Sequence, residues 1–279
     1  MSAATLKDAL AGARSLLFVP GNRPERFAKA LASGADAVIL DLEDAVPEAE
    51  KHEARRAILA QWPTLRASPT PLLLRLNAPG TPAWRDDLSL PGQLPGLAGL
   101  ICPKAESAAP LAALAPEGLP LIPLIESARG WAALAEIAGA PGVLRLALGH
   151  IDFMADTGLD DGAEEEALAP LRFAIAMHSR IAGLACAIDG VTVQTGDEAR
   201  LAEDAQRALR FGFGAKLCIH PRQIEPLHQA LRPAPAELDW AQRVLAGNAA
   251  AQGAAFQLDG RMVDLPVVLR AQRLLARAR

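Results

Sequence analysis

Short apolar runs alternate with amphipathic, helix-period segments along nearly the whole chain, and this alternation restricts the possible folds more than any other feature of the sequence. Near-continuous apolar strands are typical of sheets buried on both faces, and a regular β–α alternation is typical of parallel sheets. Eight runs have this character, which favours closure into a (β/α)8 TIM barrel over an open doubly wound sheet. They are residues 15–19, 37–41, 72–76, 100–102, 121–125, 144–148, 185–188 and 216–219.

The helix-period segments between these runs are residues 24–32, 47–61, 128–138, 164–183 and 197–211. A helical tail follows the eighth run, at residues 237–247 and 266–279, with a Gly- and Ala-rich bend between its two parts. No Gly-x-Gly-x-x-Gly follows the first run, which argues against a dinucleotide-binding fold. We therefore predict an α/β barrel domain at residues 1–230 and a C-terminal helical extension at residues 231–279, a division that suits a chain of 279 residues.

Charge and cysteine content exclude several classes of protein. The formal net charge is -4, which favours neither nucleic acid nor an anionic membrane surface as a partner. No apolar stretch reaches the roughly 18 residues of a membrane span, and the N-terminus lacks the apolar core of a signal peptide. Cys102, Cys186 and Cys218 form no Cys-x-x-Cys pair and are expected to be reduced thiols. Together these features predict a cytoplasmic protein.

Two carboxylates stand where apolar runs end. Glu126 directly follows the fifth run, and Asp152 follows the sixth after three residues. A carboxylate at the tip of a buried strand is costly unless it is paired or holds a metal, and barrel chemistry gathers at the carboxyl ends of the strands. Magnesium is often held by one or two carboxylates together with waters and substrate oxygens. The local pattern leaves two interpretations open: a magnesium site, or N-caps of the helices that follow.

Arg75 lies inside an otherwise apolar run, where a buried guanidinium needs an anion. That anion is either a substrate oxygen that bears developing charge or a structural partner such as Asp41 or Glu43, and both roles can hold at once. Asp41, Glu43 and Asp44 cannot all face one ligand, because side chains alternate along a strand. We expect one of them to reach the water shell of a metal and the others to cap a helix or pair with an arginine.

The remaining candidates have plainer interpretations. Lys104 and Glu106 are predicted to form an ion pair at the rim, and His220 is expected to be a turn residue. Asp264 precedes a proline at a helix start, where an N-cap explains it. Four basic residues near the N-terminus either receive a phosphate or solvate a helix face: Arg14, Arg23, Arg26 and Lys29.

Seven motifs occur in a characteristic order, at residues 17–22, 41–46, 74–77, 103–104, 124–130, 187–191 and 218–223. Together they resemble the CitE-like acyl-CoA lyases of the HpcH/HpaI aldolase and citrate lyase superfamily. Its members include citrate lyase beta subunits, malyl-CoA lyases and citramalyl-CoA lyases. The resemblance spans nearly the whole chain. Two features depart from it: His150 stands where a small or polar residue is expected, and the chain is shorter than malyl-CoA lyases.

The resemblance implies a (β/α)8 barrel in which Glu126 and Asp152 hold Mg²⁺, or Mn²⁺ in its place. It implies that Arg75 contacts the reacting acyl or carboxylate group. Asp264 matches the aspartate that acts as acid and base from an extension reaching over a neighbouring subunit's pocket in a homotrimer. The expected substrate or coenzyme A contacts are Arg23, Lys29, Asp41 and Glu43.

The implied reaction is reversible Claisen-type cleavage of a 3-hydroxyacyl thioester, such as citramalyl-CoA or malyl-CoA, to acetyl-CoA and a 2-oxo acid. Two alternatives remain. One is a citrate lyase beta subunit that acts on a citryl thioester of an acyl carrier protein. The other is a thioester hydrolase in which Asp264 activates water. A non-catalytic binding protein is disfavoured, because Arg75, Glu126 and Asp152 are all present.

Overall fold

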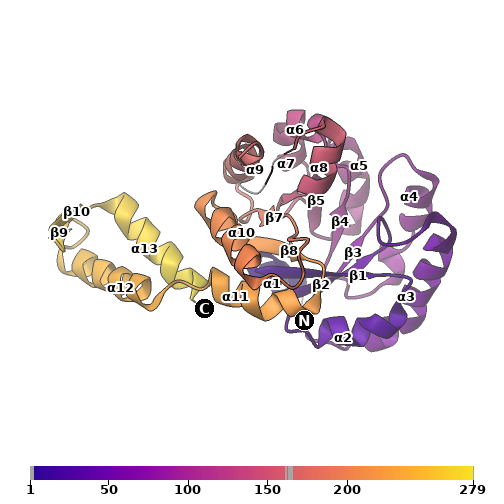
Figure 1. Ribbon diagram of the computed structural model, residues 1–279, viewed down its shortest axis with the longest axis horizontal. Helices are drawn as coiled ribbons and strands as arrows, with labels where there is room; N and C mark the ends of the chain where they lie inside the picture. Colours follow the sequence, from indigo (N-terminus) through magenta and orange to yellow (C-terminus); the bar gives the residue numbers. More distant parts are fainter. Residues whose placement is uncertain (1–2, 161, 163–165, 279) are drawn as a thin grey trace. The chain divides into compact units, whose positions relative to one another are not determined.

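Eight parallel strands close into a barrel in the order β1 to β8, which confirms the predicted fold (Figure 1). The computed structural model describes residues 3–160, 162 and 166–278. Closure is completed by β1, which pairs with β2 on one side and with β8 on the other. The strands are β1 (Ser15–Pro20), β2 (Ala37–Asp41), β3 (Leu72–Arg75), β4 (Gly99–Cys102), β5 (Leu121–Ile125), β6 (Ala147–Leu148), β7 (Ile188–Asp189) and β8 (Ala215–Cys218).

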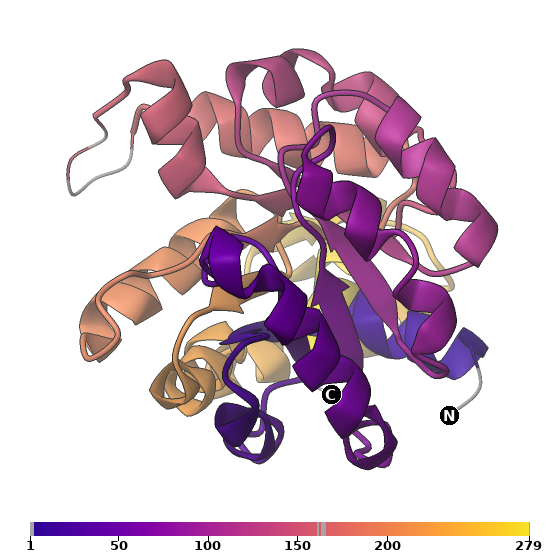
Figure 2. The ribbon, with the colours of Figure 1, turned by 90° about the vertical axis from the view of Figure 1, so that its right-hand side faces the viewer.

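Helices surround this barrel, as Figure 2 shows from the side. Alternate strand residues point inward and bury leucine and isoleucine side chains in one central cluster, so that the barrel is a packed core rather than a channel. The helices of four or more residues are α1 (Ala3–Gly12), α2 (Phe27–Leu31), α3 (Lys51–Leu65), α4 (Pro82–Asp87), α5 (Ala109–Leu114), α6 (Ala128–Ala132), α7 (Leu134–Ala138), α8 (His150–Thr157), α9 (Ala169–Ile181), α10 (Glu198–Arg210) and α11 (Ile224–Leu231). Short 3-10 turns are η1 (Pro24–Arg26), η2 (Glu48–Glu50), η3 (Pro91–Gln93), η4 (Ala115–Glu117) and η5 (Pro221–Gln223).

The chain divides into two compact units, residues 1–227 and 228–279. The second contains α12 (Pro235–Ala250), the antiparallel strands β9 (Phe256–Leu258) and β10 (Arg261–Val263), and α13 (Leu265–Arg277). The two predicted tail helices are present, but the bend between them forms a hairpin that the Gly- and Ala-rich composition did not reveal. This unit has its own apolar cluster, built from Ala241, Val244, Val263, Val268, Ala271 and Leu274.

The largest departures from prediction are β6 and β7, which are only two residues long. Of the predicted runs 144–148 and 185–188, only residues 147–148 and 188 belong to the regular ladder. Arg145 lies in the first of these runs, and its buried guanidinium binds three backbone carbonyls: those of Cys186 at 2.6 Å, Ala13 at 2.7 Å and Leu10 at 2.9 Å.

The predicted helices differ from the observed ones at their ends. The segment 128–138 is two helices, α6 and α7, joined at Ala133, and the segments 24–32 and 47–61 begin with the 3-10 turns η1 and η2. The start of the predicted helix 164–183 lies outside the described residues. Among the described residues, no helix is long and apolar enough to cross a membrane.

Candidate active site

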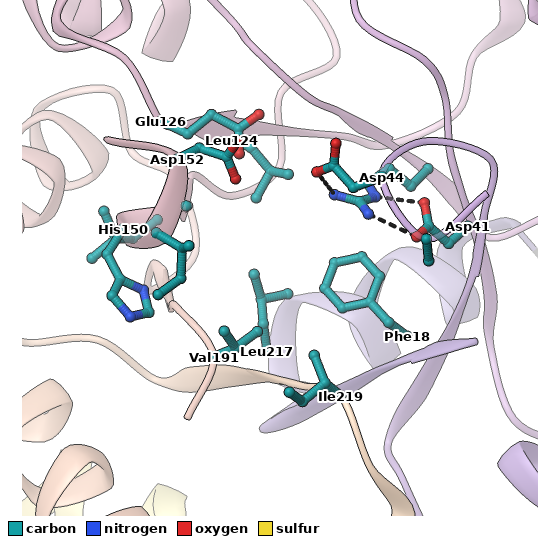
Figure 3. A pocket seen from close by; sticks show the side chains of 15 residues that line it. Phe18, Asp41, Asp44, Leu124, Glu126, His150, Asp152, Val191, Leu217 and Ile219 are labelled. Atoms are coloured by element: carbon teal, nitrogen blue, oxygen red, sulfur yellow. Dashed lines mark hydrogen bonds and ion pairs between the residues drawn. The ribbon is translucent and has the colours of Figure 1, made fainter. Parts of the chain in front are cut away.

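A cavity of about 340 Å³ opens at the carboxyl ends of the barrel strands (Figure 3). One side carries the neighbouring carboxylates of Glu126 and Asp152, and another carries Asp41 and Asp44 around the guanidinium of Arg75. The remaining wall is apolar and includes Phe18, Leu124, Leu148, Val191, Leu217 and Ile219. The fold therefore brings the predicted metal ligands, the predicted arginine and one predicted substrate contact, Asp41, to one cavity.

Neither Glu126 nor Asp152 is an N-cap. Ser127 caps α6 by accepting a 3.1 Å hydrogen bond from the Gly130 N–H, and the N-cap position of α8 is Gly149, which leaves Asp152 in the first turn. Glu126 lines the cavity and is buried, at 2% exposure. Burial disfavours the charged form of its carboxylate. Burial raises the pKa of Glu126 to about 7, although Lys104 acts against that rise.

Gly149 makes room for the Glu126 carboxylate. A β-carbon at position 149 would lie 2.3 Å from Oε2 and 2.7 Å from the β-carbon of Glu126, well inside van der Waals contact. The backbone N–H of Lys104 donates to Oε1 of the same carboxylate at 2.6 Å. Glu126 is thus held from two directions, by a hydrogen bond and by close packing.

The predicted ion pair between Lys104 and Glu106 is wrong. The Lys104 ammonium instead donates to Asp152 and lies 3.6 Å from Oε1 of Glu126. Glu106 accepts a 2.8 Å hydrogen bond from the Ser127 hydroxyl. Lys104 follows β4 and Glu126 follows β5, so neighbouring strands bring them together, and a buried carboxylate attracts a cation more strongly than an exposed one. Lys104 also has a φ of +47°, a left-handed conformation that is strained for a lysine and is often found at functional sites.

Arg75 is held by three carboxylates, so the expectation that Asp41, Glu43 and Asp44 cannot all face one group is wrong. Strand alternation does not apply to Glu43 and Asp44, because β2 ends at Asp41. Its Nε and Nη2 donate to the two oxygens of Asp41 at 2.6 and 2.7 Å, and its Nη1 lies 2.8 Å from Glu43 and 3.4 Å from Asp44. The guanidinium carbon also lies 4.7 Å from the centre of the Phe18 ring, a cation–π contact that the sequence did not reveal. Arg75 therefore pairs with structural carboxylates and also lines the cavity. Burial alone lowers the pKa of Arg75, but Asp41, Glu43 and Asp44 reverse that effect and raise it.

Glu43 is the most perturbed carboxyl group of this cluster. Burial raises its pKa to about 9, against the attraction of Arg75 and with added repulsion from Glu126 and Asp44. A cation near Glu126 and Asp152 would offset the repulsion that Glu126 exerts on Glu43.

The donor set fits a magnesium ion. Glu126 and Asp152 supply two hard oxygen ligands beside one cavity, and Mg²⁺ is usually bound by one or two carboxylates that leave room for water and substrate oxygens. Over residues 3–160, 162 and 166–278, no three His, Cys, Asp or Glu side chains converge as a metal group. The described side chains thus offer no protein cage of the kind that structural zinc requires.

A second cavity, also of about 340 Å³, lies beside the first and shares Phe18 and Ile219 with it. Arg26 and Lys29 line it. Arg23 does not line it and pairs instead with Glu25 at 2.6 Å on the surface. His220 caps η5 through Nδ1, which accepts from the Arg222 N–H at 3.1 Å, so the predicted turn role is confirmed.

His150 lines the first cavity but is buried, at 6% exposure, and its ring points away from the two carboxylates in Figure 3. A β-carbon on Gly190 would lie 2.1 Å from its Nδ1. The imidazole therefore occupies space that only a glycine at position 190 leaves open.

Asp264 belongs to the second unit. It occupies the N-cap position of α13, as predicted, but its side chain makes no capping hydrogen bond. Instead its backbone carbonyl accepts from Val267 and Val268 at 3.0 Å. Three large apolar side chains close to it in sequence are exposed: Met262 at 69%, Leu265 at 67% and Leu269 at 45%.

The comparisons with known proteins agree with one another and together cover nearly the whole chain. Residues 14–221 match the family model HpcH/HpaI aldolase/citrate lyase. A citrate lyase subunit beta-like protein of Mycobacterium tuberculosis is 41% identical over 94% of each chain. A (3S)-malyl-CoA thioesterase of Cereibacter sphaeroides is 34% identical over 95% of this chain and 94% of its own. The crystal structure of CitE from M. tuberculosis with magnesium, acetoacetate and coenzyme A superposes with a TM-score of 0.83 at 39% identity, covering 96% of this chain and 99% of that one.

Proposed function

Because the chain belongs to the HpcH/HpaI aldolase/citrate lyase family of carbon–carbon lyases, we propose that it is a Mg²⁺-dependent lyase acting on a 3-hydroxyacyl thioester. The substrate would be citramalyl-CoA or malyl-CoA, cleaved reversibly to acetyl-CoA and a 2-oxo acid. The observation that carries the proposal is the meeting of Glu126, Asp152 and Arg75 at one cavity. The magnesium, acetoacetate and coenzyme A of the M. tuberculosis structure support it.

Glu126 and Asp152 would hold the magnesium ion, or manganese in its place. When bound, such an ion supplies Lewis-acid polarisation of substrate oxygens. The chain's own part is to keep two carboxylates together at the strand ends, with Oε1 of Glu126 fixed by the Lys104 N–H.

Arg75 would face the thioester oxygen on which negative charge develops as the carbon–carbon bond breaks. A guanidinium has five N–H donors, and the three carboxylates around Arg75 leave one N–H of Nη2 free of their contacts. A preorganised donor of this kind stabilises a transition state by about 3 kcal/mol. The bidentate pair with Asp41 would keep it in place.

Asp264 would move the proton at the acetyl carbon: it protonates the departing enolate in cleavage and deprotonates the methyl group in condensation. We propose that residues 231–279 bring it to the site of a neighbouring subunit in a homotrimer. Its carboxylate is not used to cap α13, and the apolar side chains of Met262, Leu265 and Leu269, close to it in the sequence, are exposed and available to be covered in an oligomer.

The coenzyme A phosphates would meet Lys29 and Arg26 in the second cavity, which adjoins the first. Arg23 is a weaker candidate, because it would have to leave Glu25. Asp41 and Glu43 would act on the substrate through Arg75. Unpaired thiols at all three cysteines support a reducing, cytoplasmic setting.

The apolar wall favours citramalyl or malyl groups over a citryl group. Around the first cavity, Arg75 is the one arginine or lysine among the described lining residues, and three carboxylates already engage it. Apart from the Lys104 ammonium, which lies against Asp152 and Glu126, a second substrate carboxylate would meet leucines or other carboxylates, and an unpaired charge is costly to bury. A citrate lyase beta subunit acting on an acyl carrier thioester is therefore the less favoured alternative. The 34% identical thioesterase keeps hydrolysis as another.

Product analysis after incubation with citramalyl-CoA and Mg²⁺ tests the proposal. We expect acetyl-CoA and pyruvate in equal amounts, and no turnover after EDTA treatment. Free citramalate with free coenzyme A would identify a hydrolase instead. Inactivity toward coenzyme A esters, with an acyl carrier protein co-purifying, would identify a citrate lyase beta subunit.

A further inference from the structure

Lys51, the first residue of α3, carries a buried ammonium group with an unusual set of partners. The residue is 8% exposed, and Nζ donates to the carbonyls of Leu42 at 2.9 Å and Glu43 at 3.1 Å. Its third donor meets Oδ1 of Asn77. All three N–H groups of the ammonium thus bind oxygens that belong to no carboxylate. Because a buried charge is costly, such an arrangement persists only when its geometry is well satisfied.

Asn77 is itself fixed from the opposite side. Its backbone N–H and its Nδ2 both donate to Oδ2 of Asp87 at 2.7 Å. Asp87 is fully buried, and its Oδ1 accepts from Nε of Arg55 at 2.7 Å. The side-chain oxygen of Asn77 is therefore directed at Lys51. A continuous buried network runs from α3 and α4 to the end of β3.

The oxygens that Lys51 binds belong to the two segments that hold Arg75. Leu42 and Glu43 continue the chain from Asp41, and the Glu43 N–H donates at 2.9 Å to the Asp41 oxygen that accepts from Arg75 Nε. Asn77 follows Arg75 by two residues. One ammonium thus ties the segment carrying the carboxylates to the segment carrying the guanidinium.

We propose that Lys51 is a positioning residue, which fixes Arg75 relative to the cavity without touching the substrate. Lys51 is not among the residues that line the cavity. The inference rests on the proposed role of Arg75 in stabilising the developing charge. A displacement of about 1 Å in a group of this kind can reduce turnover about 100-fold.

Lys51→Met and Lys51→Arg test the proposal, with Arg56→Met as a matched control on the exposed face of the same helix, where Arg56 pairs with Glu53. We expect Lys51→Met to lower kcat about 100-fold with little change in KM. Its Mg²⁺ affinity by calorimetry should stay at the wild-type value, because Glu126 and Asp152 lie on other elements. Full kcat in a folded Lys51→Met protein would overturn the proposal.

A double-mutant cycle with Arg75→Lys separates positioning from a general structural effect. If Lys51 acts through Arg75, the double variant should lose less kcat than the product of the two single-variant fold-losses. A double-variant loss equal to that product would overturn the proposal. Lys51→Arg keeps a cation for folding but cannot place three donors on the same oxygens, so it should show an intermediate loss.

The Arg75 Nε–H resonance gives a readout that needs no activity. Arg75→Lys assigns the signal, and both Lys51 variants should shift it while Arg56→Met does not. If the wild-type protein proves to have no lyase activity, the proposed function fails, yet this experiment still reports on the link. A resonance unmoved by either Lys51 variant would overturn the positioning role.

Discussion

The backbone N–H of Lys104 donates a 2.6 Å hydrogen bond to Oε1 of Glu126, so the turn after β4 fixes the carboxylate that follows β5. The same lysine places its ammonium against Asp152. Its left-handed backbone, at a φ of +47°, makes both contacts available from one residue. Backbone and side chain have separable roles here, because glycine can keep the first contact while removing the second.

Lys104→Gly should therefore retain the hydrogen bond to Glu126 and lose only the ammonium. We expect it to be about 1 kcal/mol more stable than Lys104→Ala, since glycine adopts a positive φ without strain. Both variants should bind Mg²⁺ about tenfold more tightly, because a competing cation is gone; this is ~1.4 kcal/mol and well below the Coulomb limit at such a spacing. Urea unfolding and calorimetry measure the two effects. Weaker Mg²⁺ binding in both variants would show that the ammonium helps to build the site rather than competing for it.

Gly149→Ala should disrupt the metal site while leaving the barrel folded. The new β-carbon would sit 2.3 Å from Oε2 of Glu126, so the carboxylate must move. We expect Mg²⁺ binding by calorimetry to weaken at least tenfold, with unchanged far-UV circular dichroism. Gly196→Ala is the matched control, because a β-carbon there would meet nothing within 4 Å. Wild-type affinity in Gly149→Ala would mean that Glu126 does not bind the ion.

Asp264→Asn should keep Mg²⁺ binding and lose turnover, whereas Glu126→Ala and Asp152→Ala should lose both and keep the fold. If Asp264 acts on a neighbouring subunit, mixing Asp264→Asn with Glu126→Ala subunits should restore part of the activity. The reason is that some sites in the mixed oligomer then have an intact Glu126 and an intact Asp264. Steady-state assays of each protein and of the mixture measure this. Full activity of Asp264→Asn alone would remove it from the mechanism.

The strands were predictable because burial on both faces leaves a strong apolar signal, and the site because barrel strands deliver their last residues to one mouth. Arg145 shows the limit of the first argument: it lies in an apolar run, but its side chain binds three carbonyls and the regular ladder begins only at Ala147. The hairpin of β9 and β10 shows another limit, since five of its six strand residues are half-buried or exposed and carry little periodicity.

Within the site, sequence reasoning located Glu126, Asp152 and Arg75 but assigned Lys104 to its near neighbour Glu106. In the structure Lys104 has a positive φ and pairs across adjacent strands, so its ammonium lies near Glu126 instead of Glu106. A local sequence pattern shows neither feature. Lys51 gave no signal at all. Its partners are Leu42, Glu43 and an asparagine 26 positions away, so only the folded chain brings them together.

Glu43→Gln should change how stability depends on pH. Burial raises the pKa of Glu43 from 4.5 to about 9 in the folded protein, where Arg75, Asp44, Glu126 and Lys104 also act on it. A raised carboxyl pKa contributes stability that is complete below the unfolded-state pKa and is lost as the pH rises through the folded-state value. Glutamine imitates the neutral acid at every pH. The variant should therefore match the wild type at about pH 5 and have the higher Tm at about pH 8.

Thermal unfolding across this range, with EDTA present in every sample, measures the difference in Tm between the two proteins. Glu126 also titrates near this range, with a pKa of about 7, but it is present in both proteins and largely cancels in the difference. Glu53→Gln on the exposed face of α3 is the control and should show no such trend. A Tm difference that favours the wild type increasingly at high pH would mean that Glu43 is ionised. In that case its pair with Arg75, at 2.8 Å, would dominate over its burial.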